Sequence, residues 1–347
     1  MSRLRIAVVG AGNWGRNHVR TVASLADAEL SAVCDADARR RDAVARQYPG
    51  VLVTESVEAA LDAAEAVVVA SSANTHAAIA RLAIERGLPV LVEKPFTLTT
   101  ESAIDLVEQA ERRKVPVVVG HLLLFHPAVE RLRAMIRGGE LGEPYYLYSQ
   151  RVNLGQVRPD ENALWSFGPH DVSVALYLLE QEPILVAAHG RSYLQPGIED
   201  VVFLTMEFPS GVLAHVQMSW LDPHKERRLT VVGSSRMVVF DDMQPREKLK
   251  IYDRGVDRPP EYGSYGESLA VREGDIAIPK IPNVEPLSAE LRHFVAVARG
   301  TETPRQTARD GLAVVRVLEA ATTSLREGGE MVRLDQERAA APHGGRA

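Results

Sequence analysis

The chain has 347 residues, enough for two domains, with 46% apolar and 25% charged residues, as is ordinary for a globular protein. Its net charge of −6 at pH 7 provides no basic field, so we expect neither nucleic acid nor an acidic membrane surface as a partner. The one cysteine, Cys34, excludes an internal disulfide, and no apolar run is long enough for a signal segment or a membrane span, so we expect a cytoplasmic protein.

The first forty residues predict a strand, a glycine-rich turn and a helix. Residues 5–9 are apolar and rich in β-branched side chains, and G-x-G-x-x-G follows at 10–15, ahead of a helical pattern over 16–26. The first glycine of such a motif allows a tight turn, the second lets the backbone approach a pyrophosphate, and the third lets helix and strand pack closely. The pyrophosphate binds N–H groups at the helix N-terminus. The cofactor-binding residues expected here are Gly10, Gly12, Asn13, Trp14 and Gly15.

A second strand, over residues 30–34, ends at Asp35, which is twenty positions after Gly15. An acidic side chain at this place accepts hydrogen bonds from the ribose hydroxyls of the adenosine. Because a carboxylate repels a 2′-phosphate, we expect NAD rather than NADP as the cofactor. Three arginines at 39–41 weaken that preference, since an arginine can hold the phosphate.

Strand and helix patterns alternate as far as residue 120, with apolar runs at 66–70, 90–92 and 115–119. This alternation predicts a parallel sheet with helices on both faces, and ligands bind beyond the carboxyl ends of its strands. The loops after these strands therefore share one crevice. The further cofactor-binding residues expected in them are Ser71, Asn74, His76, Glu93 and Lys94.

The pattern changes after residue 127. Strand-like runs at 145–152, 184–192, 201–208, 212–220, 228–232 and 237–241 are joined by hairpin-like links, with one helix over 164–179. Residues 253–284 predict a long arm, and two helices follow near 288–299 and 309–327. We expect an α/β Rossmann domain over 1–122, an α+β domain with a mainly antiparallel, open-faced sheet over 123–335, and a disordered tail over 336–347. We expect the open face to be largely apolar and to pair in a homo-oligomer, a dimer or tetramer.

Lys94 is the first candidate for chemistry because the crevice argument places it beside the cofactor. A primary amine there donates a hydrogen bond to a substrate hydroxyl and stabilises the alkoxide charge that develops as hydride leaves. Glu93 is positioned to hold Lys94 in place. The histidines His76, His121 and His126 have no metal-ligand spacing and no cysteine beside them, so we expect no metal site.

Several motifs together resemble the glucose–fructose oxidoreductase / inositol dehydrogenase / MocA family. They are Gly10–Gly15, Asn74-Thr75-His76, Glu93-Lys94-Pro95, Gly120-His121 and Phe125-His126-Pro127. The resemblance covers nearly the whole chain, since a second domain with an open antiparallel sheet is also typical of that family. It implies an NAD(P)-dependent dehydrogenase that acts on the CH–OH group of a sugar or cyclitol.

The second catalytic motif of that family falls on residues 166–171. The resemblance implies that His170, at the head of a helix, takes the hydroxyl proton, and that Asp171 orients its imidazole. Many members carry an acidic residue four places before the histidine, whereas this chain has Ser166. The proton route therefore stays open, with Lys94 and His170 sharing the work as one possibility.

Residues 149–155, 162–171, 193–200, 219–225 and 262–268 resemble the branch that oxidises nucleotide-activated amino sugars, such as UDP-N-acetylglucosamine 3-dehydrogenases. This implies oxidation at C3 to a 3-keto sugar. Alternatives are a cyclitol or free-sugar dehydrogenase, a 3-ketosugar reductase, an NAD-dependent glycoside hydrolase and a non-catalytic binding protein. Basic side chains suit the diphosphate, and amide or phenol groups suit the sugar and uracil. The substrate-binding residues expected are Lys94, Arg151, Asn153, Ser166, His170, Asp171, Tyr193, Lys225 and Tyr265.

Overall fold

The computed structural model describes residues 2–155, 157–257 and 270–334. The chain divides into two compact units, one of Met1–Pro127 with Pro282–Arg316 and one of Ala128–Ile281 with Val317–Ala347. The sequence-based boundaries placed residues 282–316 in the second domain, whereas their contacts group them with the first. Within the described ranges, no helix is both long and apolar enough to cross a membrane.

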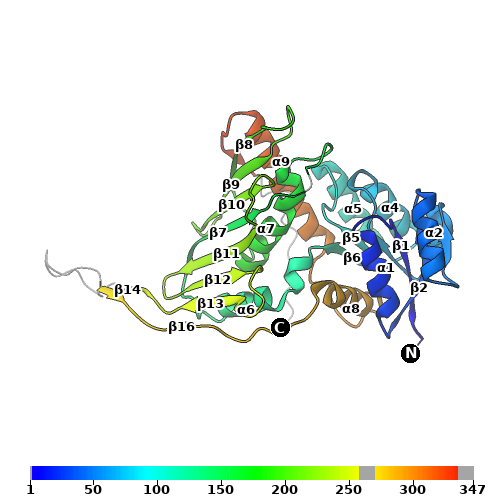
Figure 1. Cartoon of the computed structure of the whole chain (residues 1–347), viewed down its shortest axis with the longest axis horizontal. Coiled ribbons are helices and arrows are strands. Elements are labelled where there is room, and N and C mark those ends of the chain that lie inside the picture. The colour runs from blue at the N-terminus through cyan, green and yellow to red at the C-terminus, as the bar shows by residue number, and fades with distance from the viewer. Residues whose placement is uncertain (1, 156, 258–269, 335–347) are drawn as a thin grey trace. The chain divides into compact units, whose positions relative to one another are not determined.

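The first unit is built on a six-stranded parallel sheet (Figure 1). Its strand order is β3-β2-β1-β4-β5-β6, which is the doubly wound order of dinucleotide-binding folds. The predicted Rossmann domain is therefore confirmed. The strands are β1 (Leu4–Val9), β2 (Ala28–Cys34), β3 (Leu52–Thr54), β4 (Ala66–Val69), β5 (Val90–Glu93) and β6 (Val117–Gly120).

Three helices of the first unit begin after a residue whose side chain accepts a backbone N–H. Asp37, Ser56 and Thr99 serve in this way ahead of three helices, each satisfying one donor that the first turn leaves unpaired. The helices are α1 (Gly15–Ser24), α2 (Ala38–Gln47), α3 (Val57–Asp62), α4 (Ala73–Glu85), α5 (Thr100–Arg113), the 3₁₀ helix Leu122–Phe125, α8 (Pro286–Ala298) and the first half of α9 (Ala308–Arg326).

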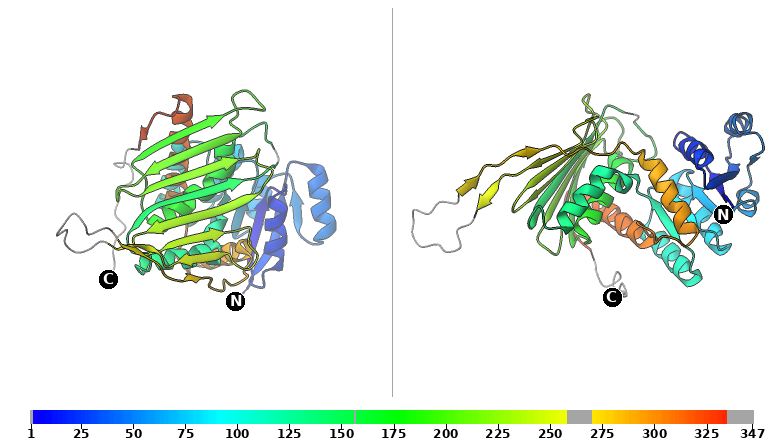
Figure 2. Two further views of the ribbon diagram at one scale, coloured as in Figure 1. Left: turned by 60° about the vertical axis from the view of Figure 1, so that its left-hand side comes forward. Right: turned by 90° about the horizontal axis from the view of Figure 1, so that it is seen from below.

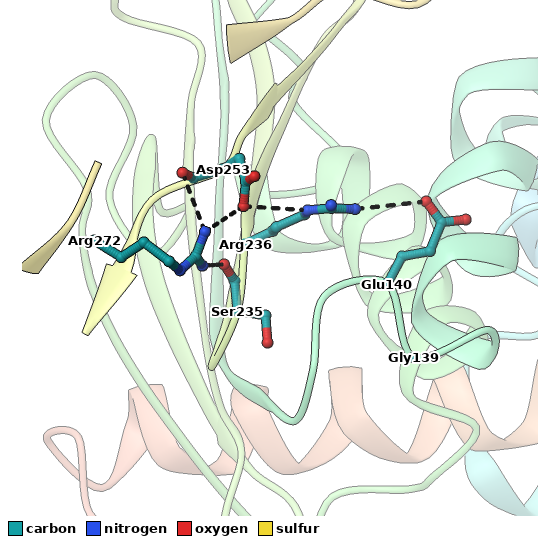
Figure 3. Close-up of a pocket in the computed structure, with 6 residues that line it drawn as sticks. All are labelled: Gly139, Glu140, Ser235, Arg236, Asp253 and Arg272. Carbon is teal, nitrogen blue, oxygen red and sulfur yellow. Dashed lines mark hydrogen bonds and ion pairs between the residues drawn. The ribbon is translucent and has the colours of Figure 1, made fainter. Parts of the chain in front are cut away.

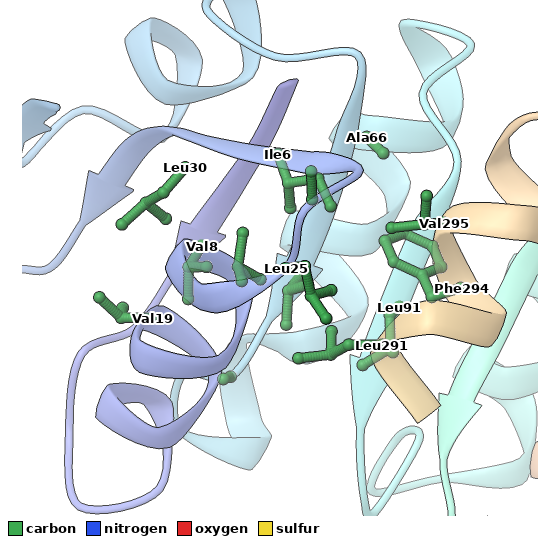
Figure 4. Packing of buried hydrophobic residues seen from close by; sticks show 14 of the residues in the cluster. Ile6, Val8, Val19, Leu25, Leu30, Ala66, Leu91, Leu291, Phe294 and Val295 are labelled. Atoms are coloured by element: carbon green, nitrogen blue, oxygen red, sulfur yellow. The ribbon is translucent and has the colours of Figure 1, made fainter. Parts of the chain in front are cut away.

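One apolar core joins the start of the chain to α8 (Figure 4). Ile6 and Val8 of β1 pack in the same buried cluster as Leu291 and Phe294 of α8, and all four are fully buried. Burying side chains of this size stabilises by about 1.5–3 kcal/mol each. Residues 282–316 therefore belong to the first unit because their apolar stripe completes its core.

The second unit contains a nine-stranded sheet in the order β16-β13-β12-β11-β7-β10-β9-β8-β17. All its pairs are antiparallel except β7 with β10, which confirms the predicted mainly antiparallel domain. The strands are β7 (Pro144–Val152), β8 (Leu185–Arg191), β9 (Val201–Glu207), β10 (Leu213–Ser219), β11 (Glu226–Gly233), β12 (Met237–Asp241), β13 (Leu249–Tyr252), β16 (Ile276–Ala277) and β17 (Val332–Arg333).

Helices cover one face of this sheet and leave the other open (Figure 2). The helix α7 (Ala163–Leu179) packs on β7, β9 and β10, and α6 (Pro127–Arg137) precedes β7 in the chain. The open face is mixed rather than largely apolar. Phe203 and Leu213 are exposed there, but Gln150 donates to Gln217 at 3.1 Å. The face therefore carries large apolar side chains together with polar ones.

The predicted arm begins as a two-stranded ladder of β14 (Gly255–Asp257) and β15 (Ala270–Arg272). Residues 258–269, and with them Tyr265, lie outside the described residues, as does the predicted tail over 336–347. A cavity of about 470 Å³ lies at the base of the arm (Figure 3). There Asp253 pairs with Arg272 at 2.5 Å and Arg236 at 3.5 Å, and Arg272 also donates to the Ser235 carbonyl. These ion pairs fix the arm to the sheet, and none of the expected site residues lines the cavity.

Candidate functional site

The glycine-rich turn of the first unit is built for close approach. Gly10 has a φ of +98°, and a Cβ there would lie 2.5 Å from the Ala70 carbonyl oxygen. A Cβ on Gly15 would lie 2.0 Å from the Gly10 carbonyl oxygen. Only glycine fits at both positions, so the sequence folds as a tight turn with the first residue of α1 against it. A cradle of this shape fits the pyrophosphate of a dinucleotide.

Asp35 lies at the carboxyl end of β2 and ties that end to the glycine-rich turn. Its Oδ2 accepts the Ala11 backbone N–H at 2.7 Å, and its Oδ1 accepts the Asp37 N–H at 2.8 Å. Arg40 approaches the carboxylate at 3.5 Å, while the Arg41 guanidinium donates to the Asp35 and Ala36 carbonyls. The acidic group is therefore held beside the glycine-rich turn, and Arg41 is engaged with the backbone.

Glu93, the last residue of β5, connects three segments of the first unit. Its Oε1 accepts from Trp14 Nε1 at 2.5 Å and from His18 Nε2 at 2.7 Å, and its Oε2 accepts the Lys94 backbone N–H at 3.0 Å. Burial opposes ionisation of this carboxyl, but hydrogen bonds from His18 and Trp14 hold the pKa of Glu93 below its ordinary value. Glu93 is thus a buried anion that accepts from the glycine-rich turn, from α1 and from the backbone of Lys94.

His76 holds the same loop from the other side. One ring nitrogen, Nδ1, lies 2.8 Å from the Pro95 carbonyl oxygen, and Nε2 lies 3.2 Å from that of Ser71. Burial lowers the pKa of His76, so the imidazole is neutral and its one N–H serves the closer carbonyl. The loops after β4 and β5 are therefore joined, with half-buried Lys94 between Glu93 and Pro95. Asn74 is exposed in the first turn of α4.

Sequence reasoning missed two buried titratable side chains near Glu93, namely His18 and Glu290. Both are fully buried on the apolar faces of α1 and α8, and Glu290 interacts electrostatically with Glu93. His121 is also buried, and burial lowers the pKa of its imidazole to about 4, which makes it neutral at pH 7. The available signal was a polar residue inside an apolar helical stripe, as in Pro286–Ala298.

The candidate substrate residues of the second unit lie at one end of its sheet, where several neighbouring strands begin or end. The register pairs Val152, the end of β7, with Ser219, the end of β10, and with Glu226, the start of β11. Ser219 also pairs with Val201, the start of β9, which in turn pairs with Arg191, the end of β8. The residues adjoining these strand ends are Asn153, Tyr193 and Lys225.

The N-terminus of α7 is bound to the same end of the sheet. Asn162 caps the helix by accepting the Trp165 N–H, and its amide donates to Glu199, which lies just before β9, at 2.6 Å. The expectation that His170 stands at the helix head is wrong, because it is the eighth residue of the helix. Ser166 is one turn before it, so the two side chains share a face.

Asp171 and Arg151 form a buried ion pair from α7 to β7. A second guanidinium nitrogen of Arg151 lies 3.4 Å from the other Asp171 oxygen, and both side chains are less than a tenth exposed. The carboxylate was expected to orient His170, and the guanidinium to meet a diphosphate. In the structure the two side chains pair with each other, and the ion pair holds α7, the helix that carries His170, to β7.

Other expected residues are more open. Tyr193 is 67% exposed and Lys225 is also exposed, whereas Ser166 is buried. Lys94 belongs to the first unit and His170 to the second. Over the residues that the structure describes, no group of three or more histidine, cysteine, aspartate or glutamate side chains is arranged to hold a metal ion.

Comparison with known proteins gives two family matches. The model described as an oxidoreductase family with an NAD-binding Rossmann fold matches residues 4–121, and the GFO/IDH/MocA C-terminal domain matches residues 129–239. Together they cover most of both units.

Three relatives illustrate the range of similarity. UDP-N-acetylglucosamine 3-dehydrogenase of Acidithiobacillus ferrooxidans is 31% identical over 92% of this chain and 96% of that protein. Inositol 2-dehydrogenase 2 of Saccharopolyspora erythraea is 35% identical, but the match spans 62% of this chain and only 66% of that protein, just under two thirds of its length. Among solved structures, GenD2 from gentamicin A biosynthesis, in complex with NAD, superimposes with a TM-score of 0.81 at 27% identity, covering 96% of this chain and 97% of that one.

Proposed function

Since this chain belongs to the Gfo/Idh/MocA family of NAD-binding sugar and cyclitol dehydrogenases, we propose that it oxidises C3 of a nucleotide-activated amino sugar, such as UDP-N-acetylglucosamine, to a 3-keto sugar. The observation that carries this proposal is the set of loops at one end of the sheet in the second unit. Loops from β7, β8 and β10 meet there with the capped start of α7, and exposed Arg191 and Lys225 supply positive charge for a diphosphate.

The chemistry rests on two side chains. Lys94 donates a hydrogen bond to the reacting hydroxyl and stabilises the negative charge that builds on its oxygen. His170 takes the hydroxyl proton, since an imidazole accepts a proton near neutral pH. When bound, NAD supplies the acceptor for the hydride. Glu93 and His76 hold the backbone on either side of Lys94, and the Arg151–Asp171 pair supports the helix that carries His170.

A substrate panel tests the proposal directly. The purified protein is incubated with NAD and, separately, with UDP-N-acetylglucosamine, UDP-glucose, dTDP-glucose, free N-acetylglucosamine and myo-inositol, and NADH absorbance is followed. We expect the largest kcat/KM for the UDP-amino sugar. A preference for myo-inositol would instead support a cyclitol dehydrogenase, the function of the Saccharopolyspora erythraea relative. Release of a free aglycone without net NADH would support a glycoside hydrolase.

The role of Lys94 has its own test. Replacing Lys94 by alanine removes a preorganised donor, which typically lowers kcat on the order of 10²–10³-fold. The matched control is Lys280→Ala, which removes an exposed lysine of the arm and should leave kcat unchanged. A Lys94→Ala protein that binds NAD and turns over like the wild type would exclude this assignment.

The open sheet face supports a homo-oligomer. Tyr146, Tyr148, Phe203 and Leu213 are each at least 39% exposed on it, and large apolar side chains gathered on one face favour an interface. Light scattering at micromolar concentration measures the mass of the particle. We expect a dimer or tetramer that dissociates when Tyr148 is replaced by glutamate, and a monomeric wild type would contradict this expectation.

A further inference from the structure

Trp14 lies inside the glycine-rich turn, but its side chain bonds outside it. Trp14 is 43% exposed, and its indole Nε1 donates to Glu93 Oε1, 79 residues later in the chain. A tryptophan that served only to cover a cofactor would need no such partner. The turn that binds the pyrophosphate is therefore directly connected to the residue that precedes Lys94.

The carboxylate of Glu93 has little freedom to move. It is buried and lies against the backbone of β6, where a Cβ on Gly120 would be only 3.2 Å from both Cδ and Oε2 of Glu93. His18 of α1 donates to the same oxygen as Trp14, since an ionised carboxylate can only accept. Two donors thus fix one oxygen, and this leaves the other oxygen aimed at the Lys94 N–H.

We propose that Trp14 and His18 are positioning residues for Lys94 that act through Glu93. This inference rests on the proposed role of Lys94 in the reaction. Losing either donor releases Oε1, and the carboxylate then no longer holds the Lys94 backbone in one place. Small displacements of a catalytic group are costly, because the reacting atoms must meet in a narrow range of geometry. The state of the cofactor-binding turn is in this way transmitted to the amine.

The principal experiment is Trp14→Phe, which keeps an aromatic ring and removes the N–H. The loss of a hydrogen bond to a charged group of this kind should lower kcat by about 10- to 100-fold. We expect that decrease with the dissociation constant of NAD changed less than about threefold. The control is Gln109→Leu, which removes a side-chain N–H bond to the Asp105 carboxylate within α5 and should leave kcat unchanged.

A double-mutant cycle separates positioning from a general structural effect. In a Lys94→Ala background, Trp14→Phe should leave the residual turnover unchanged, because the group it positions is gone. An equal loss of turnover with and without Lys94 would overturn the inference. A wild-type kcat in Trp14→Phe would also overturn the inference. If the KM for NAD rose while kcat stayed unchanged, Trp14 would be a cofactor contact alone.

These outcomes also distinguish this inference from the proposed function. Full turnover of Lys94→Ala would exclude the role of Lys94 and this inference with it. An inactive Lys94→Ala protein beside a fully active Trp14→Phe protein would exclude the positioning role only.

Discussion

Glu290 offers a sharp test of the buried charges in the first unit. Its side chain is fully buried in α8, and among the described residues neither carboxylate oxygen has a hydrogen-bond partner. Burial, and next the negative charge of Glu93, raise the pKa of Glu290 well above its ordinary value. An unpaired buried carboxylate is costly, so the folded protein keeps this group protonated and neutral. Replacing it by glutamine preserves the shape and removes the ionisation.

The magnitude follows from proton linkage. Between the ordinary pKa of a glutamate and the raised pKa in the fold, the unfolded chain releases a proton that the folded chain retains. Within that window the free energy of unfolding of the wild type falls by about 1.4 kcal/mol for each pH unit of increase. The Glu290→Gln protein lacks this decrease because glutamine does not ionise. Its stability relative to the wild type should therefore rise by about 1.4 kcal/mol per pH unit from pH 5 until the pH reaches the raised pKa of Glu290.

Urea unfolding at a series of pH values from 5 to 7 measures this difference. Only the change in the difference between the two proteins with pH matters, so a constant cost of the buried amide does not obscure it. The matched control is Glu108→Gln, the same substitution at an exposed position of α5, which should give a curve parallel to the wild type. A Glu290→Gln curve that is likewise parallel to the wild type would refute the reasoning, because Glu290 would then be ionised in the fold.

Two further predictions follow from the structure. Replacing Asp35 by serine removes the charge that repels a 2′-phosphate beside Arg40, so the ratio of kcat/KM for NADP to that for NAD should rise on the order of 10–100-fold; an unchanged ratio in steady-state kinetics would show that Asp35 does not set the preference. Replacing Phe294 by alanine should reduce the free energy of unfolding by about 3–5 kcal/mol, and Phe294→Leu by clearly less, because the cavity lies in the core that α8 shares with β1; similar losses in denaturant titrations of the two variants would contradict this.

The local part of the fold was readable from the sequence. The strands of the parallel sheet are short apolar runs, and the turn at 10–15 has glycines where no Cβ fits, so both signals are contained in a few neighbouring residues. Residues 38–54 gave no comparable pattern. The helix α2 buries only Val44, so its sequence has almost no apolar stripe, and β3 has only three residues.

The long-range contacts could not be predicted from the sequence. The return of residues 282–316 to the first unit depends on a core that β1 and α8 share across almost the whole chain. The same limit applied at the candidate site. Lys94 and Glu93 were found from a motif, but the bond from Glu93 to His18 and the pairing of Arg151 with Asp171 join segments with no common pattern.

The return of α8 also bears on how the protein is made. While the ribosome has produced only the first 127 residues, the apolar surface that Leu291 and Phe294 will cover is still open to water. The first unit therefore reaches its final packing late in synthesis, after residues 128–281 of the second unit have been made. A nascent chain stalled before residue 282 is the form in which a chaperone would find that surface uncovered.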